Sequence, residues 1–266
     1  MRSICQTVAR AVRLATPLAL LTQCLADPPL PPLAAVLKAV ARQTEKESEN
    51  ERAFNQRYDY TRTKVTEYRN GNGELKKREE KIIANNPSAV PVAYRTPPIQ
   101  SRTEPNPGGE KNEAVSETHS NVRGKAFEKK DFSLNDDLLG RFQFDLVGRK
   151  TINGRTTLVL EFRPAKKNLP ERNIKDRFIN KAAGRVWVDE ADYVIAKADV
   201  HLTESVNVVG GLVGAVWKFN YSFDRERTSD GLWFTRAVDW HLEGREVVFR
   251  RAIDYHEGKT GVRKAW

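Results

Sequence analysis

The residue types that most often bind metals or perform catalysis are sparse in this sequence, and they do not occur in pairs. Four histidines are present, at His119, His201, His241 and His256, without an HxH or HExxH pattern. A zinc ion needs three or four His, Cys or carboxylate ligands held together, and closely spaced motifs usually supply them. We therefore expect no metal centre and interpret the histidines as polar, outward-facing residues, three of them on strands.

Motifs for nucleophilic or phosphate chemistry are also missing. No GxSxG sequence occurs, and the only two cysteines, Cys5 and Cys24, both lie in the first 26 residues. Residues 210–214 read GGLVG, but the Lys-Ser/Thr pair of a phosphate loop is absent and the pattern that follows is that of a strand. The sequence therefore predicts a protein that is not an enzyme and holds no cofactor.

Positive charge is concentrated between Arg163 and Arg185. The chain has 45 Lys and Arg against 35 Asp and Glu, a formal net charge of +10, and this segment contributes eight bases against Glu171 and Asp176. Such a segment can contact an anionic membrane surface or an acidic envelope protein, and a solvated loop of a basic protein has the same composition. The candidate contact residues are Lys166, Lys167, Arg172, Lys175 and Arg177.

Aromatic residues recur at alternate positions in the last third of the chain. Alternate residues of a strand point to the same side of a sheet, so these side chains could line one apolar wall. Such a wall is suited to lipid acyl chains, and a sealed hydrophobic core predicts the same pattern. The candidate wall residues are Trp217, Phe219, Phe223, Phe234, Trp240 and Phe249.

Residues 1–26 have the pattern of a secretory signal peptide. Three arginines precede a short apolar run at 14–21, and Ala26 stands before Asp27. Removing those three arginines leaves 42 bases against 35 acids, a charge of +7, and no cysteine. We therefore expect a periplasmic or otherwise exported protein with no nucleic-acid partner. Lipidation at Cys24 and a buried amphipathic helix are the alternative interpretations of this segment.

The elements that must position the candidate residues can be read from periodicity. Apolar residues at helical spacing predict a helix over 33–54, and alternation around the glycines of 70–73 predicts a hairpin over 58–83. Residues 85–128 hold six of the thirteen prolines and few apolar residues, which predicts a disordered insertion. A short second helix is expected over 133–141.

After residue 142 the sequence contains seven alternating arms, several of them long and joined by turns such as Asn153-Gly154 and Asp230-Gly231. Long hairpin-joined strands that are apolar on one face form a curved antiparallel sheet or a barrel. We therefore predict a mainly β (α+β) fold, in which residues 27–266 form one domain. The curved sheet, or half-open β-barrel, would have its concave face covered by the N-terminal helix and the short second helix.

Four stretches resemble the LolA/LolB-like periplasmic lipoprotein-carrier superfamily, and within it the outer-membrane lipoprotein-sorting proteins. The likeness covers about half of residues 27–266, in RYDYTRTKVTEY, LLGRFQFDLVGRKTINGRTTLVLEF, GRVWVDEADYVIAKADVHL and DGLWFTRAV. The resemblance implies a half-open sheet whose mouth is plugged by helices and which binds lipoprotein acyl chains without covalent chemistry. It transfers no individual residue.

Three functions remain open at this stage. The first is a periplasmic protein that binds a lipid or lipoprotein acyl chain on the concave face. The second is an envelope sensor or interaction protein of the same fold with a sealed core. The third is an outer-membrane β-barrel, which the strands disfavour because Arg and Asp face away from their apolar side.

Overall fold

The described part of the chain forms one sheet with helices across one of its faces. The computed structural model describes residues 28–89, 136–166, 169–208, 214–246 and 248–266. Contacts divide the chain into residues 1–30 and 31–266, and every element below belongs to the second unit. The signal peptide predicted at 1–26 and most of the insertion predicted at 85–128 lie outside the described residues.

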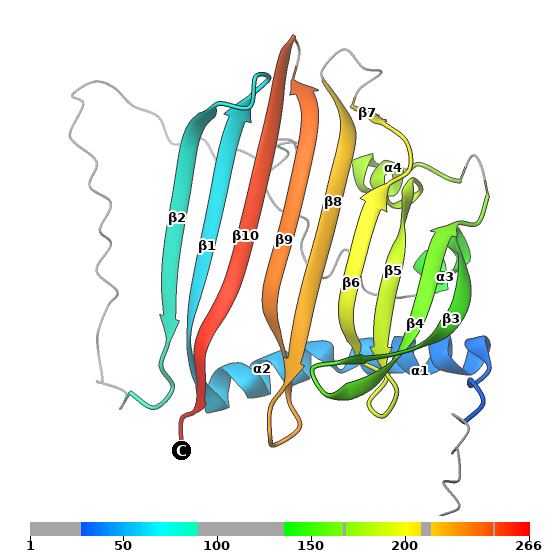
Figure 1. Cartoon of the computed structure of the whole chain (residues 1–266), viewed down its shortest axis with the longest axis vertical. Coiled ribbons are helices and arrows are strands. Elements are labelled where there is room, and N and C mark those ends of the chain that lie inside the picture. The colour runs from blue at the N-terminus through cyan, green and yellow to red at the C-terminus, as the bar shows by residue number, and fades with distance from the viewer. Residues whose placement is uncertain (1–27, 90–135, 167–168, 209–213, 247) are drawn as a thin grey trace, which may run out of the picture. The chain divides into compact units, whose positions relative to one another are not determined.

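Ten antiparallel strands make up this sheet (Figure 1). Nine follow the order β2-β1-β10-β9-β8-β6-β5-β4-β3, and β7 pairs with β8. The sheet is curved and does not close, because β2 and β3 are its two edges, so the predicted fold class is confirmed in its half-open form. The strands are β1 (Tyr58–Asn70), β2 (Leu75–Asn85), β3 (Phe142–Ile152), β4 (Arg155–Pro164), β5 (Ala182–Asp189), β6 (Ile195–Leu202), β7 (Val206–Val208), β8 (Gly214–Arg227), β9 (Trp233–Glu246) and β10 (Phe249–Lys264).

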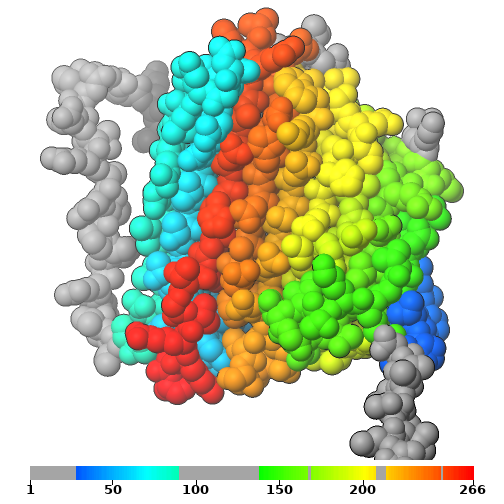
Figure 2. Space-filling view, in the orientation of Figure 1, coloured from blue at the N-terminus to red at the C-terminus, as the bar shows by residue number. Residues whose placement is uncertain are grey.

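Four helices are present in the described residues: α1 (Leu33–Glu45), α2 (Glu47–Arg57), α3 (Asp136–Arg141) and α4 (Ile174–Ile179). Figure 1 shows α1 and α2 running across the strands near one end of the sheet. We call the face that they cover the inner face and the opposite face the outer face. Figure 2 shows the strands side by side from β2 to β3. No helix in these residues is both long and apolar enough to span a membrane.

The helix predicted over 33–54 is in fact two helices, separated at Lys46, and the second continues to Arg57. The Thr44 hydroxyl donates a hydrogen bond to the Val40 carbonyl at 3.0 Å just before the break. Such bonding to the preceding turn competes with the helical ladder and is associated with bends. Apolar periodicity therefore located the helical segment but not its interruption.

The largest hydrophobic core lies between α1 and the inner face. Val36 and Val40, four residues apart on α1, are 0% and 2% exposed, because residues at this spacing share one face of a helix. Opposite them, the inward-facing residues of β4 and β5 include Leu158, Leu160 and Val188, all at most 1% exposed. The helix is thus held by the apolar stripe that the sequence predicted.

Candidate functional site

A partly open, mainly apolar cavity lies between the helices and the inner face. The cavity has a volume of about 120 Å³. Side chains of α1 and α2 form one wall, and residues of β3 to β6, β8 and β9 form the other. The sheet side includes Phe142, Phe144, Phe162, Val186, Ile195, Ala198, Val200, Tyr221, Phe223 and Trp233, and the helix side includes Gln43, Thr44, Glu47 and Asn50.

Three phenylalanines form a cluster in this wall. Phe144 and Phe162 are opposite each other on β3 and β4, and the ring centroids of Phe142 and Phe162 are 5.1 Å apart in an edge-to-face arrangement. None of the three was among the candidate wall residues, although their alternation was visible in the sequence. Alternation shows that residues share a face, but not which strands lie beneath a helix.

The predicted wall is only partly brought together. Phe223 lines the cavity, whereas Phe219 and Trp240 are 4% and 7% exposed in the core and their ring centroids are 6.4 Å apart. Phe219 also packs edge-to-face on Phe178 of α4. These two residues therefore support the site from within the sealed part of the core.

Trp217 lies on the outer face, contrary to the alternation read from the sequence. The pairing of β8 with β9 shifts register between Val216 and Lys218, which marks a β-bulge at this point. A bulge adds one residue and reverses the side to which the following residues point. Trp217 is 41% exposed, and the Arg250 guanidinium lies 5.8 Å from its ring centroid.

Phe234 and Phe249 lie away from the cavity. Phe234 stacks on Phe54 of α2 at 4.7 Å, in a separate cluster with Tyr58 and Tyr60. Phe249 begins β10, is 67% exposed, and borders a second concave region of about 930 Å³ near the end of the sheet. Of the six candidates, only Phe223 therefore contacts the cavity.

A buried ion pair joins α2 to the sheet at the edge of the cavity. The Arg225 guanidinium on β8 pairs with the Glu47 carboxylate, and its side chain is 10% exposed. Burial disfavours its charged form and lowers the Arg225 pKa to about 10, so the guanidinium stays protonated at neutral pH. This pair supplies a charged contact between the polar helix side of the cavity and its mainly apolar sheet side.

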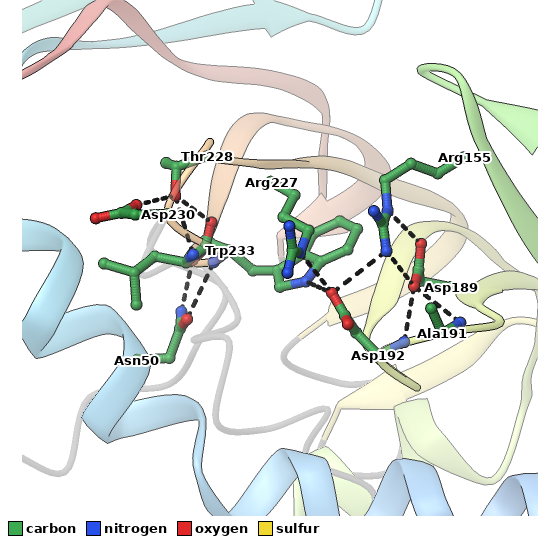
Figure 3. Close-up of polar contacts among 10 residues, drawn as sticks. Asn50, Arg155, Asp189, Ala191, Asp192, Arg227, Thr228, Asp230 and Trp233 are labelled. Carbon is green, nitrogen blue, oxygen red and sulfur yellow. Dashed lines mark hydrogen bonds and ion pairs between the residues drawn. The ribbon is translucent and has the colours of Figure 1, made fainter.

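A second polar connection fixes α2 against the start of β9 (Figure 3). The Asn50 amide donates to the Trp233 carbonyl at 2.5 Å, and the Trp233 backbone N–H donates to Asn50 Oδ1 at 3.0 Å. The Trp233 indole N–H donates to Asp192 Oδ2 at 2.9 Å, which also accepts from Arg227 Nε at 2.7 Å. The turns between β5 and β6 and between β8 and β9 are thereby tied to the helix.

The neighbouring Arg155 and Asp189 form a bidentate ion pair, with distances of 2.6 and 2.8 Å (Figure 3). Asp189 Oδ1 also accepts the backbone N–H groups of Ala191 and Asp192. Burial raises the Asp189 pKa, but the hydrogen bonds from Arg155 and the backbone outweigh it and leave the pKa below its usual value. We interpret this network as a rigid support for the end of the cavity.

His201, His241 and His256 lie on the outer face as expected, around a groove of about 640 Å³, and His119 lies outside the described residues. His241 contacts Asp254 at 2.6 Å through Nδ1 and Glu243 at 2.8 Å through Nε2, so carboxylates occupy both ring nitrogens. No group of three or more His, Cys, Asp or Glu in the described ranges is arranged to hold a metal ion.

The basic segment contains α4, a helix that the sequence reading did not predict. Its signal was present in Asn173, whose side chain accepts the Asp176 backbone N–H at 3.0 Å as an N-cap. Arg172 pairs with Asp176 at 3.4 Å and Arg177 with Glu171 at 3.2 Å. Lys166 is exposed, Lys175 is half-buried, and Lys167 lies outside the described residues. Both arginines are thus partly neutralised by local carboxylates.

Comparison with known proteins gives structural neighbours at low identity. No family model matches the chain, and no match was found among curated proteins. A solved structure described as an outer membrane lipoprotein-sorting protein domain from Vibrio parahaemolyticus is 13% identical. Its TM-score is 0.29, and the match covers 83% of this chain and 93% of that one.

Two further neighbours are similar in extent. A LolA superfamily protein from Nitrosomonas europaea is 8% identical, with a TM-score of 0.28, over 84% of this chain and 92% of that one. MucB of Pseudomonas aeruginosa, solved in complex with MucA, is 8% identical, with a TM-score of 0.24, over 85% and 98%. The superfamily that the sequence motifs resemble is thus represented among the structural neighbours of this chain.

Proposed function

We propose that this chain is a non-catalytic periplasmic protein that binds an acyl chain of a lipid or lipoprotein beneath α1 and α2. The observation that carries the proposal is the cavity between these helices and the inner face, with Phe142, Phe144, Phe162 and Phe223 in its wall. Apolar side chains that border an empty space give up contacts with one another. Filling that space with methylene groups restores these contacts and removes the ligand's apolar surface from water.

The size of the cavity limits what it takes up. Ligand pockets usually measure roughly 300–1,000 Å³, and this cavity of about 120 Å³ has room for the end of one chain. The rest of a longer chain must lie along the inner face or displace α2. The polar contacts Asn50–Trp233 and Glu47–Arg225 are the ones that such a displacement would break.

Export to the periplasm is part of the proposal and is supported by the leader pattern of residues 1–26 and by the absence of cysteine after Cys24. A second candidate function is an envelope interaction protein with a sealed core. The close packing of Phe219 with Trp240 and Phe178 favours it, since these aromatic residues fill part of the inner face with side chains rather than with space for a ligand. Acyl binding distinguishes the two functions.

The test is to purify the full chain from the cells that produce it and to identify co-purified lipid by mass spectrometry. Binding of a fluorescent fatty acid is then titrated for three proteins: the parent chain, Ala198→Leu and Ala252→Leu. Ala198 lies in the cavity wall and is 3% exposed, so leucine fills the space. Ala252 lies opposite Glu243 in the β9–β10 pairing, on the outer face, and serves as the matched control.

We expect co-purified acyl lipid, several-fold weaker fatty-acid binding by Ala198→Leu, and unchanged binding by Ala252→Leu. Circular dichroism of each variant establishes that its sheet is intact. A parent chain that carries no lipid and binds no fatty acid would refute acyl binding and favour the interaction protein. Equal weakening by the two variants would refute the assignment of binding to this cavity.

A further inference from the structure

The inner face beside the helices has an unusual distribution of charge. Five bases from three adjacent strands point to this face and form what we call the basic strip: Arg62 and Lys64 of β1, Lys77 and Lys81 of β2, and Lys259 of β10. Arg251 of β10 points to the same face, but it pairs with Glu246 at 3.1 Å and is not counted in the strip. Among residues on the same face of these strands, Glu79 and Glu257 are the carboxylates next to the strip. The strip therefore has an excess of three positive charges.

Contacts with aromatic rings of the hydrophobic clusters show that the side chains of the basic strip point to the inner face. The Lys259 ammonium lies 5.4 Å from the Phe54 ring centroid and 5.2 Å from that of Tyr60, and both rings belong to the cluster under α2. The Lys77 ammonium lies 5.7 Å from the ring centroid of Tyr68, which packs against the main core.

Within the strip, like charges stand directly opposite each other. Lys64 is the cross-strand partner of Lys81, and Arg62 is the partner of Lys259. Directly opposed like charges destabilise a sheet, and natural sequences break such local rules mainly where function requires it. The outer face of β2 has no such excess, since Lys76 pairs with Glu74 at 2.9 Å and Arg78 with Glu80 at 3.1 Å.

Two carboxylates of the same strands lie beside the strip, and Glu79 pairs with Lys77 at 2.5 Å. Glu257 is shared by Lys64 at 3.1 Å, Arg62 at 3.8 Å and the Tyr255 hydroxyl at 2.6 Å. The Arg62 Nε is buried and has no hydrogen-bond acceptor within the described part of the chain. A buried N–H donor without an acceptor is costly, so the strand residues around the strip do not satisfy all of its polar groups.

One row of paired residues connects the strip to the cavity. Phe223 in the cavity wall is paired with Val238, Val238 with Glu257, and Glu257 with Lys64. Neighbouring strands are about 4.8 Å apart, so Lys64 lies roughly 14 Å from Phe223 across the inner face. A molecule with an apolar end in the cavity and a negative group at this distance would satisfy both surfaces.

We propose that the basic strip binds the anionic headgroup of an amphiphile whose acyl chain occupies the cavity. This inference rests on the proposed function and adds the ligand class, an anionic lipid. It also assigns headgroup contact to β1, β2 and β10 in place of the segment 163–185, where Arg172 and Arg177 have carboxylate partners of their own.

The test uses the full chain and three single-chain probes that carry the same fluorescent acyl group: lysophosphatidylglycerol, lysophosphatidylcholine and monoacylglycerol. We expect the anionic probe to bind about tenfold more tightly than the other two, because each nearby base contributes to attraction of an anionic headgroup. Raising the salt concentration should reduce this preference, since solvent-exposed charges are screened.

Two double variants locate the preference. Lys64→Gln with Lys81→Gln removes two charges from the strip, and Lys76→Gln with Arg78→Gln removes two charges from the outer face at the same edge. The first variant should lose about tenfold in affinity for the anionic probe alone, and the second should retain it. Lys81→Gln by itself should keep or raise the urea midpoint, because it relieves an opposed pair of like charges.

The outcomes separate this inference from the function beneath it. Equal affinity for all three probes, or equal losses in the two double variants, overturns the headgroup site and leaves acyl binding intact. Binding of no probe removes the proposed function and this inference together. Equal probe affinities with tight binding of a Glu-rich peptide, abolished by the strip variant, would instead assign the strip to an acidic protein partner and overturn the inference.

Discussion

The Arg155–Asp189 ion pair near the end of the cavity should contribute strongly to stability. The Asp189 side chain is 1% exposed and that of Arg155 is 32% exposed, so removing the arginine leaves a buried carboxylate with backbone donors alone. We expect Arg155→Ala to lower the free energy of unfolding by about 3 kcal/mol. Urea denaturation at neutral pH measures this loss, and a change below roughly 0.5 kcal/mol would contradict the account.

The same pair predicts a dependence on pH. Because the folded-state pKa of Asp189 lies below its usual value, its contribution to stability is complete above the unfolded pKa and is lost as the pH falls through the folded one. The difference between the parent and Arg155→Ala should therefore be largest near neutral pH and shrink below about pH 4. A difference that stays constant down to acid pH would argue against charge pairing as its cause.

The face to which a side chain points could be predicted from the sequence only where the strand is regular. Phe219, Phe223 and Trp240 point inward as alternation requires, whereas the bulge beside Trp217 places that residue on the opposite face from Phe219. A bulge depends on the pairing of two strands, which a single strand's sequence does not encode. The opposed charges of Lys64 and Lys81 were likewise invisible before the register of β1 and β2 was known.

At the scale of elements, close approach of β5 and β6 depends on a glycine. A Cβ at Gly184 would overlap the carbonyl oxygen of Asp199 on β6, whereas one at Gly140 would meet nothing within 4 Å. We expect Gly184→Ala to destabilise the fold by about 2 kcal/mol through overpacking. Gly140→Ala, in α3, should be neutral or stabilise it by about 0.5 kcal/mol.

Thermal unfolding followed by circular dichroism compares these two variants under one set of conditions. A lowered midpoint for Gly184→Ala only is the expected result. A midpoint for Gly184→Ala equal to that of the parent chain would mean that the strands separate to admit the methyl group at little cost. Equal losses in both would contradict the open surroundings of Gly140.

Elements with strong local signals were predictable, and those stabilised by tertiary contacts were not. The turns Asn153-Gly154 and Asp230-Gly231 are present, with positive φ angles at Asn153, Gly154 and Gly231 that glycine and asparagine tolerate. The three-residue β7 was not predicted, because its pairing with β8 rather than its sequence defines it. The six-residue α4 was also missed, being too short for apolar periodicity to identify.

At the scale of the molecule, the last strand connects the two ends of the sequence. β10 pairs with both β9 and β1, so β1 and β2 reach the rest of the sheet only through it. Deleting residues 249–266 should therefore abolish cooperative unfolding in urea monitored by tryptophan fluorescence. Deleting Trp266 alone, which is 72% exposed, should leave the transition unchanged, and a sharp transition in the longer deletion would contradict this role of β10.

The curved, half-open sheet could be predicted because hairpins pair neighbouring strands in sequence. The pairing of β1 with β10 could not be, since no local signal relates strands so far apart. The position of the cavity was also unpredictable, because it depends on which strands α1 and α2 cross. Alternation in the sequence therefore predicts which residues of a strand share a face, but the strands that lie beside it are known only from the assembled sheet.

The late arrival of β10 has a consequence for the newly synthesised chain. About 180 residues separate the end of β1 from the start of β10, and ribosomes add roughly 5–20 residues per second. Roughly 10 to 35 seconds therefore pass between synthesis of β1 and synthesis of β10, its partner. During that interval the backbone of the Tyr- and Thr-rich strand β1 is unpaired along one edge. Chaperones would meet this chain in an incomplete state, with its first hairpin the last part of the sheet to be closed.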